Sequence, residues 1–193
     1  MRAAARRSQL LDVTALLAVE RGFHAVSVEA VAQRAGVTRA VIYQHFGDLQ
    51  SLLETVVDRE MSSAQAQVVH TTPTDLGAGR ATDLLLENLA AFLTAVREHP
   101  MTWRLVLMPP EGAPAVLSDR IARGRGAVLG QITRAVRLGL RAEELGDAEL
   151  TARLLSAFAD EYARLVLTDP ERYPPDRLLD HARWWLAQPS FGL

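Results

Sequence analysis

The chain has 193 residues, no cysteine and a formal net charge of −2, with 49% hydrophobic and 23% charged residues. That composition is typical of a globular protein long enough for one sizeable core or two small ones. The absence of cysteine excludes disulfides, cysteine zinc sites and cysteine nucleophiles. The five histidines lack zinc-ligand spacing, and no apolar run approaches the roughly 18 residues of a membrane span. We therefore expect a cytoplasmic protein with no metal, no cofactor and no membrane contact.

Helical periodicity dominates the sequence, and strand-like alternation is nearly absent. In chain order, helices are predicted over about 6–21, 28–35, 38–46, 49–69, 81–98, 101–108 and 116–142. Two strongly amphipathic helices follow, on either side of a break at 168–176. Ser27, Thr38 and Asp48 are the predicted N-caps of three of these helices, and Gly36 ends one. The predicted fold class is all-α, with about nine helices and no internal repeat.

Residues 27–46 form two short predicted helices joined by a tight turn at Gly36. This is the organisation of a helix-turn-helix, whose second helix enters the major groove of DNA. On geometry alone, the alternative to a helix-turn-helix is an ordinary helical hairpin within a helical bundle. Residues 1–47 also hold six arginines against three acidic residues, whereas residues 48–193 hold fifteen against twenty. The excess positive charge thus lies where a polyanion would be met.

The faces of the second helix favour insertion into DNA. At 100° per residue, Ile42 and Phe46 share one side, which we expect to be buried. Ala40, Val41 and Gln44 fall on the opposite side, with Tyr43 and His45 flanking them. Small central residues allow close approach to bases, and rim groups reach phosphates.

Arg39 begins this helix, where the macrodipole disfavours a cation. Its position is therefore unhelpful for folding, but it suits a residue that meets a guanine edge or a phosphate.

Residues 10–53 closely resemble the DNA-binding region of TetR-family transcriptional regulators. The matching marks run in the same order over the whole segment and include Leu10-Leu11-Asp12, Gly22-Phe23, Ser27-Val28, Ala35-Gly36-Val37, Ile42-Tyr43 and His45-Phe46. The resemblance covers about a quarter of the chain. It implies a three-helix DNA-binding domain over residues 1–50 and a helical ligand-binding and dimerisation domain over 51–193.

The resemblance also implies particular DNA contacts and a mode of action. Bases or the adjoining backbone are approached by Thr38, Arg39, Ala40, Val41 and Gln44, and phosphates by Ser27, Tyr43 and His45. The implied function is a homodimeric regulator, most often a repressor, which binds a palindromic double-stranded operator and is released by a small-molecule effector. Leu49 stands where the family often has a lysine, so the phosphate contact of that lysine is not expected here.

The C-terminal region offers weaker signals. Four apolar side chains are candidates for an effector pocket, although core packing is the favoured explanation for any single one: Phe92, Trp103, Met108 and Phe158. The last two helices are candidates for a four-helix dimer interface, through Leu154, Phe158, Tyr162, Leu178 and Trp185. The alternative is that these residues pack only within one protomer.

An enzymatic function is not expected, because the sequence has no nucleophile-elbow or zincin signature and no catalytic residue is assigned. A helical adaptor that binds another protein is the remaining alternative. An adaptor has no need for Arg39, Tyr43, Gln44 and His45 around one short helix.

Overall fold

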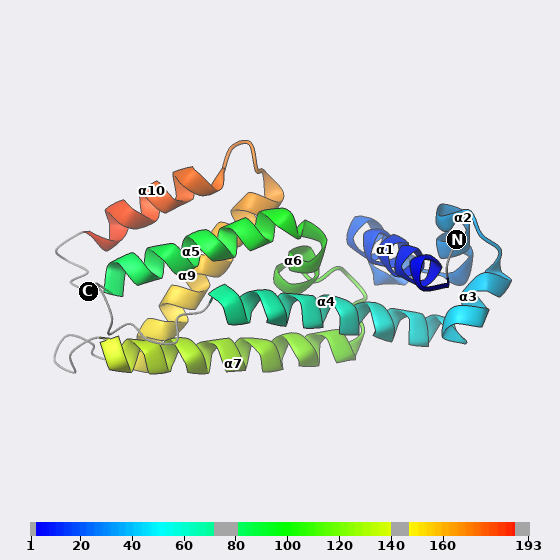
Figure 1. Ribbon diagram of the computed structural model, residues 1–193, viewed down its shortest axis with the longest axis horizontal. Helices are drawn as coiled ribbons and strands as arrows, with labels where there is room; N and C mark the ends of the chain where they lie inside the picture. The colour runs from blue at the N-terminus through cyan, green and yellow to red at the C-terminus, as the bar shows by residue number, and fades with distance from the viewer. Residues whose placement is uncertain (1–2, 72–80, 140–146, 188–193) are drawn as a thin grey trace. The chain divides into compact units, whose positions relative to one another are not determined.

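The computed structural model describes residues 3–71, 81–139 and 147–187 (Figure 1). These residues form nine α-helices and one short 3-10 helix, and no strand occurs among them. The all-α prediction is confirmed. The helices are α1 (Ala3–Arg21), α2 (Val28–Ala35), α3 (Arg39–Phe46), α4 (Leu49–Thr71), α5 (Ala81–Glu98), α6 (Pro100–Leu107), α7 (Ala115–Gly139), α9 (Ala148–Thr168) and α10 (Pro175–Leu186), and the 3-10 helix η1 covers Phe23–Ala25.

The predicted helix bounds agree closely with these, because most ends carry local signals. Ser27 caps α2 by accepting a hydrogen bond from the backbone N–H of Ala30 at 3.1 Å, and Asp48 accepts one from Ser51 N–H at 2.7 Å. The η1 helix was not predicted, since three residues carry no periodic signal. The end of the helix expected to run to residue 142 lies partly outside the described residues.

The chain divides into two compact units, and each unit is made of two separate segments of the sequence. The first contains Met1–Ala64 and Met101–Ile121, and the second contains Gln65–Pro100 and Ala122–Leu193. The first unit therefore includes α6 and the start of α7 together with the N-terminal helices. The predicted domains, 1–50 and 51–193, stay a prediction about functional modules.

The core of the first unit explains this division. Leu10 of α1, Ile42 of α3 and Leu52 of α4 are fully buried in one apolar cluster. Leu105 of α6 and Leu117 of α7 are fully buried in the same cluster. Burying a leucine side chain contributes about 1.5–3 kcal/mol, so α6 and α7 supply part of the core on which the N-terminal helices depend.

The turn between α6 and α7 touches the backbone after α1. The N–H of Phe23 donates a hydrogen bond to the carbonyl of Glu111 at 2.8 Å. Gly112 next to it has φ +72°, and a Cβ atom there would lie 3.1 Å from the backbone nitrogen of His24. A left-handed backbone and this close approach together require glycine at position 112.

A polar network joins three helices of the first unit. Arg59 of α4 donates to Asp12 of α1 at 2.6 Å and to the neighbouring Glu60 at 2.6 Å. The carboxylate of Glu60 is buried and also accepts a hydrogen bond from the Thr102 hydroxyl of α6 at 2.5 Å. Because a buried carboxylate is costly without partners, this network ties α4 to α6 as well as to α1.

In the second unit, α5 packs against both α9 and α10 (Figure 1). Stacked rings join the last two helices: Phe158 and Trp185 lie 5.0 Å apart at 21°, and Phe158 lies 4.3 Å from Tyr162. The Tyr162 hydroxyl is hydrogen-bonded to Nδ1 of His181 at 2.5 Å. Burial raises the pKa of Tyr162 above its usual value. The α9–α10 pair is therefore held by aromatic packing within one chain.

No helix among the described residues is long and apolar enough to cross a membrane. The same residues contain no cluster of His, Asp and Glu side chains arranged to hold a metal ion.

Replacing Gly112 with alanine tests the contact between the α6–α7 turn and η1. We expect Gly112→Ala to lower the free energy of unfolding by about 1–2 kcal/mol, because a β-carbon is unfavourable at positive φ. Urea unfolding followed by circular dichroism measures it. The matched control is Gly124→Ala within α7, where a Cβ meets nothing within 4 Å. That control should gain roughly 0.5–1 kcal/mol, since alanine is the better helix former. Equal effects of the two changes would contradict the proposed strain.

Removing the hydroxyl of Thr102 tests the buried network. We expect Thr102→Val to cost about 1–3 kcal/mol of unfolding free energy, because the buried Glu60 carboxylate loses a donor. Thr55→Val is the control, since the Thr55 hydroxyl donates only to a carbonyl of its own helix. A cost for Thr102→Val no larger than that of the control would show that Glu60 does not depend on this hydrogen bond.

Candidate nucleic-acid interface

The turn between α2 and α3 is set by Gly36. This residue has φ 65° and ψ 39°, the left-handed conformation, and its N–H closes the end of α2 on the carbonyls of Ala32 and Gln33. The chain then leaves α2 and begins α3 three residues later. Two short helices with this tight turn form a helix-turn-helix.

The two sides of α3 differ as the sequence predicted. Ile42 is fully buried and Phe46 is 9% exposed, so both anchor the helix in the core of the first unit. On the opposite side Ala40 and Gln44 are exposed, whereas Val41 is half-buried; Arg39, in the first turn, is exposed as well. The buried edge of this helix is thus confirmed, and a surface of mixed small and polar groups remains accessible.

The other predicted contact residues differ in exposure. Tyr43 is half exposed, at 50%, and Thr38 is exposed. Val41 and His45 are half-buried, and Val41 packs in part against the core cluster. Ser27 is half-buried at the start of α2, where its oxygen is already engaged by Ala30 N–H. The structure therefore presents Thr38, Arg39, Ala40, Tyr43 and Gln44 most openly.

Thr38 occupies the N-cap position of α3 but does not act as expected for a cap. Its φ of −83° and ψ of 155° are those of a cap residue, yet its side chain makes no capping hydrogen bond. The N–H groups of the first turn of α3 are therefore not satisfied by this side chain.

Arg39 forms an ion pair that the sequence analysis missed. Its Nη1 donates to Oε1 of Glu29 in the first turn of α2 at 2.8 Å. The hydrogen bond from Arg39 holds the pKa of Glu29 below its usual range. This pair links the starts of the two helices of the motif.

A second arginine lies beside the motif. The Arg7 guanidinium of α1 sits 4.8 Å from the centre of the Phe46 ring, within range of a cation–π contact. Arg7 is exposed, so its charge is held next to the C-terminal end of α3 while remaining accessible. Pairing across 39 residues carries no local sequence signal, which is why this contact was not predicted.

Leu49 follows the motif at the start of α4. It is half-buried and packs against the apolar cluster of the first unit. The side chain therefore supports the core at this position instead of carrying a positive charge.

The predicted effector residues lie in both units. Trp103 and Met108 belong to the first unit, where Trp103 is buried and Met108 is 37% exposed. Phe92 and Phe158 belong to the second unit, and both are half-buried. The effector pocket formed by these four residues stays a prediction.

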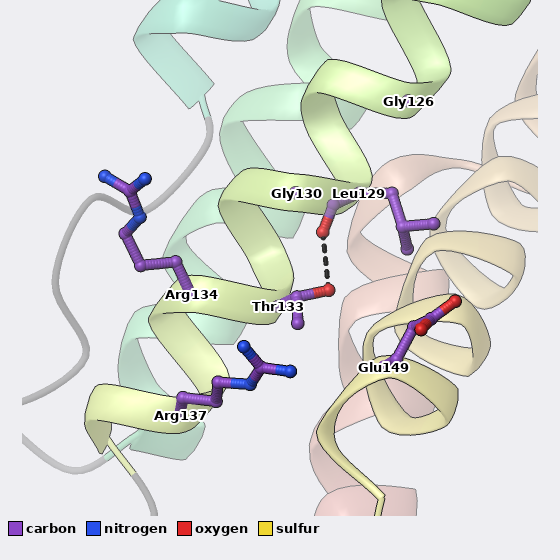
Figure 2. Close-up of a pocket in the computed structure, with 7 residues that line it drawn as sticks. All are labelled: Gly126, Leu129, Gly130, Thr133, Arg134, Arg137 and Glu149. Carbon is purple, nitrogen blue, oxygen red and sulfur yellow. Dashed lines mark hydrogen bonds between the residues drawn. The ribbon is translucent and has the colours of Figure 1, made fainter.

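An open pocket of about 560 Å³ lies elsewhere in the second unit, between α7 and the start of α9 (Figure 2). It is lined by Gly126, Leu129, Gly130, Thr133, Arg134, Arg137 and Glu149. The Thr133 hydroxyl donates to the Leu129 carbonyl at 2.8 Å, and Glu149 pairs with Arg153 at 2.8 Å. None of the four predicted effector residues lines this pocket.

The predicted dimer residues differ sharply in exposure. Tyr162 and Leu178 are 6% and 5% exposed, and they are covered within one chain. Leu154, in contrast, is 71% exposed on α9. Two further apolar side chains that the sequence analysis did not select are also exposed, Leu150 at 58% and Trp184 at 60%.

Residues 10–56 match the family described as bacterial regulatory proteins, tetR family. Over these residues the chain thus carries a domain similar to the tetR family. Among curated proteins, the chain is 32% identical over 104 residues to the HTH-type transcriptional activator FasR of Mycolicibacterium smegmatis. That match covers 52% of this chain and 45% of FasR, so less than half of the relative is matched.

Solved structures share the fold of this chain. A TetR-like transcriptional regulator from Rhodococcus sp. RHA1 superposes with a TM-score of 0.74 at 20% identity, covering 97% of this chain and all of that one. A putative transcriptional regulator from Saccharomonospora viridis, solved in complex with choline, gives a TM-score of 0.63 at 22% identity, covering 96% of each chain. These likenesses show the all-helical fold.

The different roles of Ser27 and Thr38 generate a prediction for this helix-turn-helix. Ser27→Ala removes a capping hydrogen bond and should cost about 1 kcal/mol of unfolding free energy. Thr38→Ala removes no capping bond and should change stability by less than about 0.5 kcal/mol. Thermal unfolding of both variants measures the difference. A larger loss for Thr38→Ala than for Ser27→Ala would contradict the capping described above.

Proposed function

We propose that this chain belongs to the TetR family and is a ligand-responsive, DNA-binding transcriptional regulator that acts as a homodimer. The observation that carries the proposal is the exposed surface at α3, to which Thr38, Arg39, Ala40, Tyr43 and Gln44 contribute while Ile42 and Phe46 are buried.

The chemistry of these side chains suits a B-DNA major groove. Ala40 has no bulk that would keep the helix away from base edges. The Gln44 amide is able to donate to and accept from adenine, and the Arg39 guanidinium is able to donate twice to guanine. Tyr43 and His45 lie beside them with hydrogen-bonding groups that reach phosphates.

Dimerisation follows from the geometry of palindromic sites. Two recognition helices contact successive major grooves when their half-site centres lie about 34–36 Å apart or somewhat more. We place the interface on α9 and α10, where Leu154 of the predicted set is exposed, and we add the exposed Leu150 and Trp184 to that set. Exposed apolar side chains on the last two helices are suited to a four-helix contact.

A small effector would favour one spacing of the two helix-turn-helix motifs over another. Such coupling requires a ligand with different affinities for the two states. The choline complex of the Saccharomonospora protein supports a small-molecule site in a chain of this fold. In this chain the network of Asp12, Arg59, Glu60 and Thr102 connects α1 with α4 and α6, so a shift of α6 would reach the DNA-binding helices.

We further propose a cytoplasmic location, no enzymatic activity and repression as the direction of control. A bound dimer that covers a promoter blocks transcription from it, and the result is repression. The relative FasR is named an activator, so the direction must be measured. A reporter gene behind the bound site, compared with and without the regulator, decides between the two.

The primary test is a gel shift with double-stranded DNA from upstream of the protein's own gene and its neighbours. We expect sequence-preferring binding that weakens as salt rises, because phosphate contacts release counterions. An unrelated duplex of equal length is the control. Equal binding to both, or none at low salt, would refute the regulator and favour a helical adaptor that binds another protein.

Substitutions in α3 separate phosphate contacts from base contacts. Tyr43→Ala should weaken binding to all duplexes about equally, through lost backbone contacts. Gln44→Ala should instead reduce discrimination between bases at one position by about 1–3 kcal/mol. Competition gel shifts with single-base variants of the bound site measure both effects. Gln131→Ala, an exposed residue of the second unit, is the control. If Tyr43→Ala and Gln44→Ala both leave affinity unchanged, α3 is not the recognition helix.

A further inference from the structure

Glu29 and Arg39 face each other across the helix-turn-helix. Glu29 is the second residue of α2, Arg39 is the first residue of α3, and 2.8 Å separates Oε1 from Nη1. Both side chains remain open to solvent, at 63% and 64% exposure. An acidic side chain therefore lies on the surface that the proposed function assigns to a polyanion.

The local electrostatics of the two residues are opposite. Glu29 lies in the first turn of α2, where the helix dipole favours a negative charge. Arg39 lies at the same end of α3, where the dipole disfavours a positive charge. The carboxylate of Glu29 offsets that repulsion and fixes a side chain that would otherwise sample many rotamers.

One guanidinium bond to Glu29 leaves most donors of Arg39 available. A guanidinium carries five N–H donors in a planar fork, and only Nη1 is used by Glu29. The remaining edge keeps two parallel donors, which match the O6 and N7 acceptors of guanine. The pair thus leaves a bidentate base contact intact while partly neutralising the charge that would attract any phosphate.

We infer that Glu29 is a specificity-determining residue that acts through Arg39, holding its guanidinium for contact with a guanine edge and disfavouring contact with phosphates. The inference rests on the proposed DNA-binding function. Glu29 itself touches no base in this arrangement, so it is a positioning residue.

A contribution to folding stability does not account for the Glu29–Arg39 pair. Exposed ion pairs typically contribute little to folding, and both partners are largely solvated. A second exposed pair of the same unit, Arg34 with Glu20 at 3.3 Å, joins α2 to α1 without involving α3. That pair provides a matched control, because removing Glu20 deletes the same charge from the same unit.

The experiment is selection of bound sequences by the full-length protein from a pool of duplexes with a randomised central segment. The unchanged protein, Glu29→Gln, Arg39→Gln and Glu20→Gln are each used, and enriched sequences are compared position by position. The affinity of each variant for one duplex of unrelated sequence is measured in parallel. Thermal unfolding confirms that each variant is folded.

We expect Arg39→Gln to abolish a guanine preference at one position of each half-site. Glu29→Gln should reduce the same preference by roughly tenfold, within the range of one bidentate contact, and leave the other positions unchanged. Its affinity for the unrelated duplex should rise a few-fold, because a negative charge near phosphates is removed. Glu20→Gln should reproduce the preferences of the unchanged protein.

Several results would overturn the inference. One is that Glu29→Gln keeps the full preference that Arg39→Gln loses, and another is that Arg39→Gln loses no preference. A Glu20→Gln protein with the same loss as Glu29→Gln would assign the effect to net charge alone. If the unchanged protein enriches no sequence, the proposed function itself fails, which is a different outcome from these three.

Discussion

The hydrophobic core of the first unit is the feature on which the rest of that unit depends. The N-terminal helices supply only part of this core, and α6 and α7 supply the remainder. Leu105 of α6 and Leu117 of α7 occupy the same fully buried cluster as Leu10, Ile42 and Leu52. The Phe23–Glu111 hydrogen bond holds the α6–α7 turn against the end of α1. The helix-turn-helix therefore shares its core with α6 and the start of α7, which lie about sixty residues further along the chain.

This support gives the open side of α3 its rigidity. Ile42 and Phe46 point into the cluster, so the exposed residues between them are presented on a fixed helix face. The same rigid frame brings Glu29 and Arg39 together at 2.8 Å from two different helices. A preorganised surface loses less conformational entropy on binding.

Local signals made much of this predictable from the sequence. Periodicity and cap residues located the helices, the 3.6-residue period identified Ile42 and Phe46 as the buried edge, and glycine at position 36 marked the turn. Contacts between distant segments carry no such signal. Thus the Glu29–Arg39 pair, the Arg7–Phe46 contact and the place of α6 in the first unit emerged only from the structure. The apolar stripes of the last two helices, one containing Tyr162 and the other Leu178, were recognised. Periodicity alone does not distinguish burial within one chain from burial between two.

The discontinuous first unit has a consequence for dissecting the protein into parts. A fragment ending at residue 64 would retain α1, α2, α3 and most of α4 but lose Leu105 and Leu117. Its uncovered apolar side chains would face water and favour self-association. Limited proteolysis between α4 and α6 would, in contrast, leave the two pieces of the first unit associated, because they share one core.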